Sequence, residues 1–169
     1  VTGAGGSIGG ELCRQILDLS PNRLIILDHS EYCLYNLYEK LIANCSIEIV
    51  PVLSTITEFN RVKTVMNKYS INTVYHAAAY KHVPMVELNP VDGIRNNILG
   101  TYVCVKAALS EDSIESVVLI SSDKAVRPTN IMGATKRFSE LIFQSAQDLS
   151  HNIIFSIVRF GNVLDSTGS

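Results

Sequence analysis

The chain has 169 residues, of which 47% are hydrophobic and 18% are charged, and its formal net charge is -2. This length is enough for one domain with a sizeable core, and the composition excludes an intrinsically disordered chain. The near-neutral charge argues against a nucleic-acid surface, and no apolar segment is long enough for a signal peptide or a membrane span. Within this segment we therefore expect contact neither with nucleic acid nor with a membrane.

The four cysteines show neither close pairing nor the spacing of metal ligands. Because they lie among apolar residues, we expect reduced core side chains rather than disulfides, and no metal site. This use of cysteine predicts a cytosolic setting. The residues are Cys13, Cys33, Cys45 and Cys104.

The chain opens on Val-Thr-Gly-Ala-Gly-Gly-Ser-Ile-Gly-Gly, a pattern typical of a strand end, a glycine turn and the first turn of a helix. Gly3 permits the tight turn, Gly6 lets a phosphate approach the backbone, and Gly9 lets the helix pack against the strand. The N–H groups at the helix start, with the positive end of the helix dipole, would bind a pyrophosphate. A purely structural turn can use the same glycines.

Asp28 favours the dinucleotide interpretation. It closes an apolar run over residues 23–27, which is typical of a buried parallel strand, and it follows Gly9 by 19 residues. At that spacing an acid binds the adenosine ribose hydroxyls, and its charge would repel a 2′-phosphate, so we predict NAD. His29 and Ser30 do not exclude NADP, and a solvated acid at a strand end is the alternative.

Helix and strand patterns then alternate along the chain, without repeats or internal linkers. We expect helices over 11–19, 32–43, 58–68, 97–110 and 133–149, and strands over 23–27, 47–52, 72–76, 116–121 and 153–159. This alternation predicts an α/β fold with a doubly wound parallel sheet, in which ligands bind beyond the carboxyl ends of the strands. The loops that follow the strands are therefore the candidate sites.

The loop after the strand expected over 72–76 reads His-Ala-Ala-Ala-Tyr-Lys-His over residues 76–82. Its three alanines would form a flat wall for a cofactor ribose and phosphates, and Lys81 and His82 would reach toward a bound ligand. A small-residue packing site with two solvated charges is the alternative. His76 itself fits a hydrogen-bonded core residue better than a catalyst.

The loop over residues 121–129 reads Ser-Ser-Asp-Lys-Ala-Val-Arg-Pro-Thr. A strand end that displays hydroxyl, carboxylate and ammonium groups together indicates acid–base chemistry. Met132 and Lys136 stand four residues apart on the next helix, so both would face this loop. Surface charges and a helix cap explain each residue singly, but they explain the combination poorly.

Together these motifs resemble the extended short-chain dehydrogenase/reductase superfamily, through the Gly3-Gly6-Gly9 turn, the run Asn-Ile-Leu-Gly-Thr from Asn97, and a hydroxyl group followed by Lys136. More narrowly, the chain resembles the bacterial nucleoside-diphosphate-sugar 4,6-dehydratases of polysaccharide and glycan biosynthesis. The resemblance covers essentially all 169 residues. The segments that carry it are His76–Pro84, Ser121–Pro128, Gly133–Arg137 and Arg159–Leu164.

This resemblance implies an NAD-binding Rossmann-type catalytic domain over residues 1–169. Only two residues precede the glycine turn, whereas a strand normally has about five, so we expect a piece cut from a longer protein at both ends. Larger members carry membrane-spanning segments upstream and a substrate-covering region downstream. By that likeness the full-length protein would be a homo-oligomer anchored in the inner membrane, with this domain on the cytoplasmic side.

The implied reaction is redox-neutral and acts on UDP-N-acetylglucosamine or a close relative, with NAD as the cofactor. A hydride leaves sugar C4 for NAD, and the resulting 4-ketone acidifies the C5 proton. A base then removes that proton while an acid assists loss of the C6 hydroxyl as water. The hydride returns to C6, which leaves a 4-keto-6-deoxy sugar and regenerated NAD.

By the same resemblance, Lys124 is the C5 base, Asp123 protonates the leaving hydroxyl, and Ser122 hydrogen-bonds the C4 oxygen. Lys136 would hold the nicotinamide ribose and, as a cationic neighbour, lower the pKa of Lys124. Taken together, the candidate catalytic positions are Ser122, Asp123, Lys124, Met132 and Lys136; the cofactor-binding positions are Gly3, Gly6, Ser7, Ile8, Gly9, Asp28, Thr55, Ile56, Ala77, Ala78, Ala79 and Lys136; and the substrate-binding positions are Lys81, His82, Asn97, Arg159 and Asn162.

Two positions depart from the superfamily pattern. Most members carry a tyrosine, which accepts the C4 hydroxyl proton, where this chain has Met132. The membrane-anchored dehydratases resemble this chain in having methionine there, so we interpret Met132 as a feature of that subgroup. Asp123, or a water bound to it, would then accept the C4 hydroxyl proton. Many relatives also place an aspartate against adenine where this chain has Ser-Thr-Ile over residues 54–56, which predicts weaker adenine binding.

Two other interpretations stay open. A 4-epimerase or a C5-inverting dehydratase would share the turn and most loops, and product analysis separates them because only dehydration consumes the C6 hydroxyl. A non-catalytic NAD-binding module is the alternative from a different class. Met132 favours that module, whereas the intact Asp123–Lys124 pair argues against it.

Overall fold

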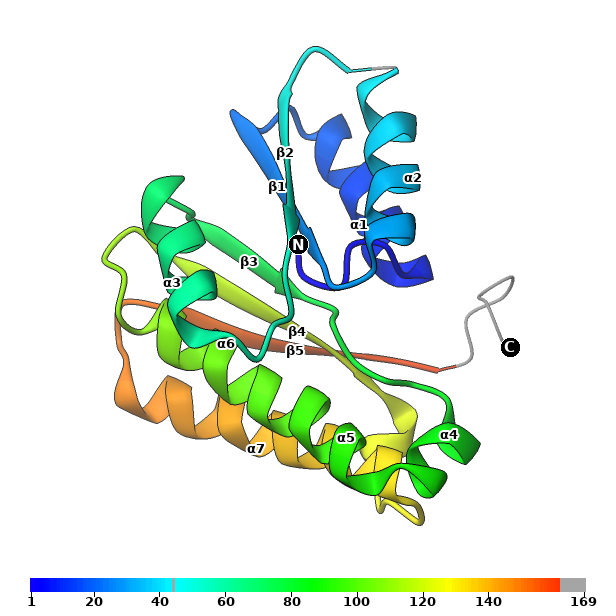
Figure 1. Ribbon diagram of the computed structural model, residues 1–169. Helices are drawn as coiled ribbons and strands as arrows, with labels where there is room; N and C mark the ends of the chain where they lie inside the picture. The colour runs from blue at the N-terminus through cyan, green and yellow to red at the C-terminus, as the bar shows by residue number, and fades with distance from the viewer. Residues whose placement is uncertain (44, 162–169) are drawn as a thin grey trace.

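The computed structural model describes residues 1–43 and 45–161 and shows an α/β fold in which helices cover a parallel sheet (Figure 1). All five strands expected from the sequence are confirmed, with ends displaced by one residue at most. The strands are β1 (Arg23–Asp28), β2 (Glu48–Leu53), β3 (Thr73–His76), β4 (Ser116–Ser122) and β5 (Ile154–Phe160). The helices are α1 (Ser7–Asp18), α2 (Glu31–Ile42), α3 (Phe59–Lys68), α4 (Val83–Leu88), α5 (Pro90–Ile94), the π-helical turn η1 (Arg95–Leu99), α6 (Gly100–Ala108), the 3-10 turn η2 (Asp123–Ala125) and α7 (Ile131–Leu149).

Thr2 joins two groups of strands into one sheet. β1 pairs with β2, and β4 pairs with both β3 and β5, all in parallel. Between β1 and β3, Thr2 bridges to Leu27 on one side and to His76 on the other. Its amide donates to the Tyr75 carbonyl at 2.9 Å. The resulting order, β2–β1–Thr2–β3–β4–β5, confirms the predicted doubly wound arrangement.

β1 is buried on both faces of the sheet, which accounts for its uninterrupted apolar run. On one face Ile26 packs with Cys13 of α1 and Leu34 of α2. On the opposite face Leu27 packs with Val65 of α3. Helices α1 and α2 therefore cover one side of β1, and α3 covers the other.

The largest hydrophobic cluster lies between β3, β4 and helices α3, α6 and α7. Leu119 of β4 and Cys104 of α6 belong to it, together with Phe143 of α7, which meets Phe155 of β5 edge to face with ring centroids 5.5 Å apart. Figure 1 shows α6 and α7 running side by side beneath β4 and β5. This packing holds the first turn of α7 near the carboxyl end of β4.

The predicted helix over 97–110 begins at a different place. α5 starts at Pro90 and continues through the π-helical turn η1 into α6. Proline is suited to a first helical position because its missing N–H has no intrahelical partner there. The π-helical turn carries Asn97. The sequence also does not indicate α4, which is too short to show a helical repeat.

No helix within the described residues is long and apolar enough to cross a membrane. The same residues contain no group of three or more His, Cys, Asp or Glu side chains that could hold a metal ion. A cavity of about 660 Å³ lies near the starts of β1 and β3, where Pro21, Met66 and Ile71 line it. It is therefore at the end of the strands opposite to the predicted ligand edge.

The turn geometry predicts that Gly9 tolerates no side chain. A Cβ at Gly9 would collide with the backbone carbonyl of Gly3, whereas a Cβ at Gly6 would meet that carbonyl at 3.4 Å, an ordinary contact. We expect Gly9→Ala to lower the free energy of unfolding by roughly 1–3 kcal/mol, as overpacking does. Urea unfolding of the full-length protein measures the loss, with Gly6→Ala as the matched control. Equal losses in the two variants would contradict this interpretation.

Candidate functional site

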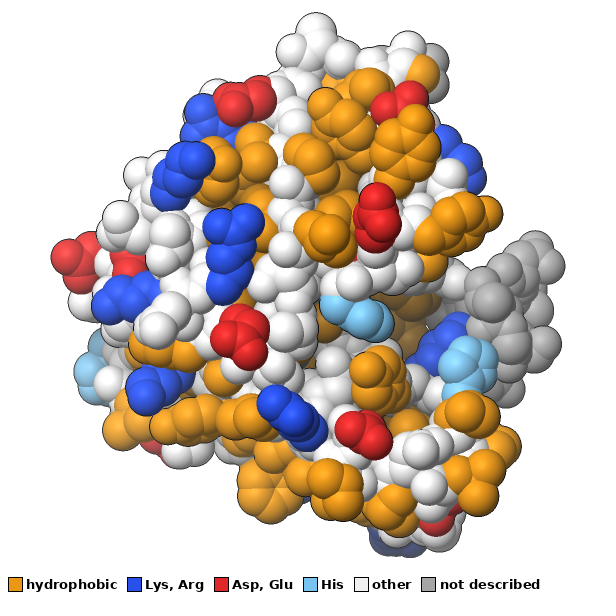
Figure 2. All heavy atoms as spheres, viewed as in Figure 1, with side chains coloured by type: hydrophobic (Ala, Val, Ile, Leu, Met, Phe, Trp, Pro, Cys, Tyr) orange, Lys and Arg blue, Asp and Glu red, His pale blue; other side chains and the backbone are white. Residues whose placement is uncertain are grey.

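A cavity of about 350 Å³ opens at the carboxyl ends of β1, β2 and β3. In the space-filling view it belongs to the hollow between the upper part of the molecule, built on α1 and α2, and the lower part, built on α4 to α7 (Figure 2). Seven of the twelve predicted cofactor positions line it. The lining residues are Gly3, Gly5, Gly6, Leu27, Asp28, His29, Ser30, Cys33, Ser54, Ile56, Ala77, Ala78, Ala79, Tyr80 and Asn96.

Small residues bring the glycine turn against the loop after β3. Gly3 has a φ of 63°, which glycine adopts without strain, and a Cβ there would lie 2.6 Å from the Ala78 Cα. Ala77, Ala78 and Ala79 line the cavity beside this turn, as the sequence predicts. Gly9 does not line the cavity and serves the packing of α1 instead.

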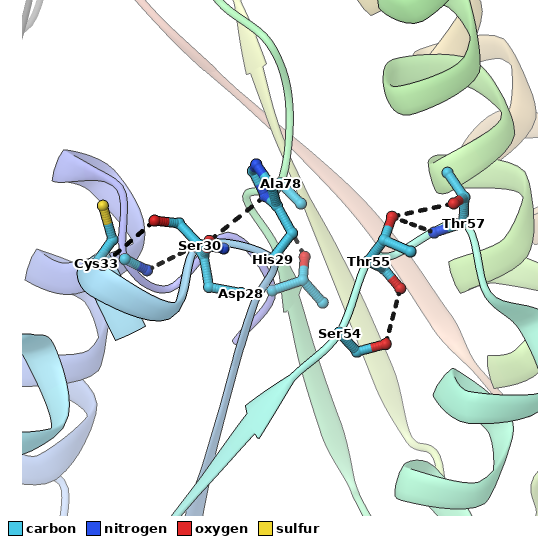
Figure 3. A network of polar contacts seen from close by, with 10 residues as sticks. Asp28, His29, Ser30, Cys33, Ser54, Thr55, Thr57 and Ala78 are labelled. Atoms are coloured by element: carbon cyan, nitrogen blue, oxygen red, sulfur yellow. Dashed lines mark hydrogen bonds and ion pairs between the residues drawn. The ribbon is translucent and has the colours of Figure 1, made fainter. Parts of the chain in front are cut away.

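Asp28 forms a fixed anionic wall of the cavity. Its carboxylate is nearly buried and accepts a hydrogen bond from the Gly5 amide and another from the Ser30 amide, each at 2.9 Å. The His29 ring stands 3.5 Å from the same carboxylate. Figure 3 shows Asp28 and Ser30 at the end of β1, across from the segment after β2 that carries Thr55. Because two amides hold it, the carboxylate has a fixed direction in which to receive two hydroxyl groups.

The N-terminus of α1 lies at the same cavity. Its N-cap residue is Gly6, which offers no side chain to satisfy the first helical amides. The amides of a first helical turn and the helix dipole together favour an anion at such a position. Ser7 and Ile8 form the start of this helix and are not among the cavity-lining residues.

The segment after β2 contributes less than the sequence predicts. Ile56 lines the cavity and is also a core residue with 3% exposure. Thr55 does not line it, because its hydroxyl contacts the Thr57 hydroxyl at 3.0 Å within a local turn. Ser54, which the sequence places beside these residues, lines the cavity in its stead (Figure 3).

The cysteines are free thiols, but only two of them are core residues. Cys13 and Cys104 are fully buried, and burial raises the pKa of each thiol, to about 11 and about 12. Cys45 is partly exposed, and Cys33 lines the cavity from the first turn of α2. The expectation of four core cysteines is therefore wrong for Cys33, whereas Cys45 is partly buried and packs against the hydrophobic cluster that contains Ile26.

His76 is a core residue, as predicted, and links the glycine turn to α6. Its Nδ1 lies 2.8 Å from the Thr2 hydroxyl and its Nε2 lies 3.0 Å from the Thr101 hydroxyl. The Thr101 hydroxyl donates to the Asn97 carbonyl, so we assign the proton of the neutral ring to Nε2. Burial, reinforced by the charge of Lys136, lowers the pKa of His76 to about 3.

Asn97 fastens the β3 loop to α7. Its amide group donates to the Tyr80 carbonyl at 3.0 Å and to the Thr135 hydroxyl at 2.9 Å. Its side-chain oxygen accepts from the Tyr80 amide at 2.7 Å and from the Asn96 side chain at 3.0 Å. Because these contacts use both donors and both acceptor sites, the geometry supports a positioning role rather than substrate contact.

The predicted acid–base residues lie together at the carboxyl end of β4. The Lys124 Nζ donates to the Asp123 Oδ1 at 3.3 Å, and the Ser122 hydroxyl donates to the same oxygen at 3.0 Å. These two hydrogen bonds hold the pKa of Asp123 below its usual range, and the one from Ser122 has the larger effect. The side chains of Asp123 and Lys124 are 55% and 41% exposed, so water reaches both groups.

The first turn of α7 touches this acid–base segment. A Cβ on Gly133 would collide with the Lys124 carbonyl, so glycine permits the close approach. Met132 is buried with 3% exposure. One turn later, Lys136 is 8% exposed and its ammonium donates to the Ile120 carbonyl at 2.5 Å. Burial lowers the pKa of Lys136 to about 8, and the charge of Glu140 opposes that shift.

The predicted substrate-binding residues occupy different environments. Lys81 and His82 are exposed between β3 and α4. Arg159, at the end of β5, forms two hydrogen bonds with Glu140, a fully buried acid that the sequence does not single out. Its spacing of four residues from Lys136 is the signal that could have indicated it. Asn162 lies outside the described residues.

Comparison with known proteins identifies relatives over the whole chain. The family model described as "Polysaccharide biosynthesis protein" matches residues 1–169. The capsular polysaccharide biosynthesis protein CapD of Staphylococcus aureus is 47% identical over 171 residues, which cover 100% of this chain and 28% of the relative. A UDP-N-acetylglucosamine 4,6-dehydratase (inverting) of Campylobacter jejuni is 33% identical over 172 residues, which cover 100% of this chain and 50% of that protein.

Among solved structures, Pen from Bacillus thuringiensis superposes with a TM-score of 0.91 at 35% sequence identity. The match covers 99% of this chain and 51% of that chain. This chain therefore spans about half or less of the length of these proteins.

The buried His76 predicts a loss of stability in acid. Its pKa is about 3 in the folded chain, whereas an unfolded histidine titrates near 6.5, so the unfolded state binds an extra proton between these values. The contribution of the neutral ring is thus complete above pH 6.5 and falls as the pH drops below it, by up to about 1.4 kcal/mol per pH unit. Urea unfolding between pH 7.5 and 4.5 should show wild type losing stability faster than His76→Gln. Parallel curves would refute this assignment.

Proposed function

The chain belongs to the polysaccharide biosynthesis protein family, and on that premise we propose that it is the NAD-binding catalytic domain of a nucleotide-sugar 4,6-dehydratase. The substrate is a UDP-N-acetylhexosamine, UDP-N-acetylglucosamine in the first place, and the product is a 4-keto-6-deoxy sugar nucleotide. The observation that carries this proposal is the shared edge of the sheet, where the cavity at β1–β3 and the Ser122–Asp123–Lys124 segment of β4 open at the same strand ends.

The cavity fits NAD. Asp28 is fixed to receive the two adenosine ribose hydroxyls, and the uncapped start of α1 at Gly6 suits the pyrophosphate. The three alanines of the β3 loop leave the ribose and phosphates a wall without polar side chains. NAD in this place would take up a hydride from the sugar and later return it. A carboxylate at position 28 disfavours NADP, which remains the less suited cofactor.

The Asp123–Lys124 pair can provide both an acid and a base. The hydrogen bond between Lys124 and Asp123 joins an ammonium to a carboxylate, and moving one proton across it gives an amine and a carboxylic acid. Water favours the ion pair, whereas a substrate that covers the pair and excludes water favours the neutral form. In that form Lys124 removes the C5 proton and Asp123 protonates the departing C6 hydroxyl.

The neighbouring residues orient the sugar. The Ser122 hydroxyl lies beside the pair and can hydrogen-bond the C4 oxygen. Lys136, buried against β4, would hold the nicotinamide ribose. The Met132 thioether cannot accept the C4 hydroxyl proton, so Asp123, as a carboxylate in the first step, takes it directly or through a water. Lys124 gives its ammonium proton to water in the same step, which leaves the pair as the amine and the carboxylic acid that the elimination needs. Lys81, His82 and Arg159 remain candidates for contacts with the substrate.

The full-length protein is proposed to be a homo-oligomer anchored in the inner membrane, with this domain in the cytoplasm. Support for self-association comes from α6 and α7, which expose apolar side chains side by side. Tyr102 is 49% exposed, Phe138 is 53% exposed and Leu141 is 44% exposed. The likeness to CapD and the incomplete coverage of longer relatives support further segments in the whole protein.

Product analysis distinguishes this proposal from its alternatives. Incubation of the full-length protein with UDP-N-acetylglucosamine, followed by NMR, should show loss of the C6 hydroxyl and a 4-keto carbon. The configuration at C5 separates a retaining from an inverting dehydratase. An intact C6 hydroxyl with an inverted C4 would indicate an epimerase, and an unchanged substrate would favour a non-catalytic NAD-binding module.

Replacement of Lys124 by alanine should abolish product formation. Loss of a general base typically costs about 10²- to 10⁴-fold in rate. We expect Lys124→Ala to lower kcat within that range and to leave NAD affinity within about twofold, because Lys124 does not line the cavity. Steady-state kinetics and NAD titration measure the two effects. Lys40→Ala, on the exposed side of α2, is the control, and turnover equal to that control would refute the assigned base.

Replacement of Asp28 by asparagine should weaken NAD binding and reduce discrimination against NADP. The variant loses the charge that attracts ribose hydroxyls and repels a 2′-phosphate. We expect the Kd for NAD to rise roughly tenfold and the ratio of NADP to NAD affinity to rise as well. Calorimetric titration with both dinucleotides checks this, against Glu31→Gln, an exposed acid of α2 outside the cavity. Unchanged discrimination would show that Asp28 does not contact the ribose.

A further inference from the structure

Glu140 is the most completely paired buried acid at the catalytic edge. Its side chain is fully buried in α7 and accepts four hydrogen bonds. Arg159 donates two of them, at 2.8 and 2.7 Å, the Ser121 hydroxyl donates one at 2.7 Å, and Arg137 donates one at 2.9 Å. A carboxylate has about four acceptor sites, so every site is occupied.

These contacts tie α7 to two neighbouring strand ends. Ser121 of β4 and Arg159 of β5 are paired residues in the sheet, and Glu140 binds both side chains. Ser121 directly precedes the segment with the acid–base pair. Hydrogen bonds lower the pKa of Glu140 to about 2, with the largest effect from Arg159 and smaller ones from Ser121 and Arg137. The carboxylate is therefore ionised at every working pH.

Arg159 keeps donors for a ligand. Two of the five N–H groups of its guanidinium bind Glu140, and the other three contact no acceptor within the described residues. Its side chain is 44% exposed, at the carboxyl end of β5. A guanidinium held from one side by a carboxylate, with a planar set of donors left open, suits bidentate binding of a phosphate.

We propose that Glu140 is a positioning residue that holds Arg159 with its free donors at the strand ends, where they bind the diphosphate of the nucleotide sugar. This inference rests on the proposed function, because a nucleotide-sugar substrate supplies the diphosphate. It adds that the pair of Glu140 and Arg159, which links α7 to β5, determines how firmly that diphosphate is held. The adenosine contacts at Asp28 and Gly6 lie on β1 and α1, away from this pair, and Lys136, the proposed nicotinamide-ribose contact, keeps its own hydrogen bond to the Ile120 carbonyl.

UDP is the probe, because it carries the diphosphate and binds without turnover. Calorimetric titration of the full-length protein should give a UDP Kd raised roughly tenfold in Glu140→Gln, which loses the charge but keeps the size. Arg159→Lys, which keeps the charge but loses the fork of donors, should show a similar loss. Arg137→Gln removes one hydrogen bond of Glu140 without touching Arg159 or Ser121, so it should leave the Kd within about twofold.

Four further measurements separate a positioning role of Glu140 from a general loosening of the structure. In Glu140→Gln the Kd for NAD should stay within about twofold, and KM for the UDP-sugar should rise more than kcat falls. Glu140→Asp, which restores the carboxylate, should recover part of the UDP affinity. The double variant Glu140→Gln/Arg159→Lys should lose no more UDP affinity than the weaker-binding single variant, because both changes act on one contact.

The inference is overturned if Glu140→Gln binds UDP as well as Arg137→Gln does, or if it loses NAD and UDP affinity in parallel. Should Glu140→Gln fail to fold, wild-type UDP affinity in Arg159→Lys overturns it equally. Failure of the proposed function is a different result: wild type then forms no dehydrated product, while the variants still separate in UDP affinity. Absence of UDP binding by wild type itself would reject the diphosphate site.

Discussion

The close contact between the glycine turn and the loop after β3 is the constraint on which the rest of the structure depends. Gly3 approaches the Ala78 backbone so nearly that a Cβ would lie 2.6 Å from its Cα. The adjacent Thr2 pairs with Leu27 on one side and His76 on the other. One short segment thus joins the two groups of strands and, at the same point, borders a cavity that glycines and alanines line on this side.

Polar groups at the strand ends are kept in place mainly by other protein groups. Among the described residues, every buried side-chain nitrogen or oxygen has a hydrogen-bond partner. Asn97 is saturated by Tyr80, Thr135 and Asn96, and Glu140 by its three partners. These satisfied groups form a rigid support, since a buried polar group that loses its partner costs free energy. Asp123 and Lys124 differ from these groups, because both are about half exposed and their mutual contact is open to water.

Much of the fold could be predicted from local patterns in the sequence. The glycine spacing and the apolar run before Asp28 predict the turn, β1 and the acid at its end, because each depends on residues close together in the chain. The residues missed in the cavity, such as Gly5, Cys33 and Tyr80, depend on which loops meet there. The helix predicted over 97–110 is preceded by α5 and a π-helical turn, because tertiary packing stabilises a short proline-led helix and a π-helical turn that lack a clear hydrophobic repeat.

By itself, the sequence determined the alternation of strands and helices, the glycine turn, and the residue types that follow each strand, since these reside in local spacing and composition. Tertiary structure alone decided which of those residues face a ligand and which serve the core. It turned Asn97 inward, drew Thr55 into a local turn and paired Arg159 with a buried acid from a helix 19 residues earlier in the chain. The physical reason is that hydrogen-bond saturation and burial depend on partners distant in sequence, which no local pattern specifies.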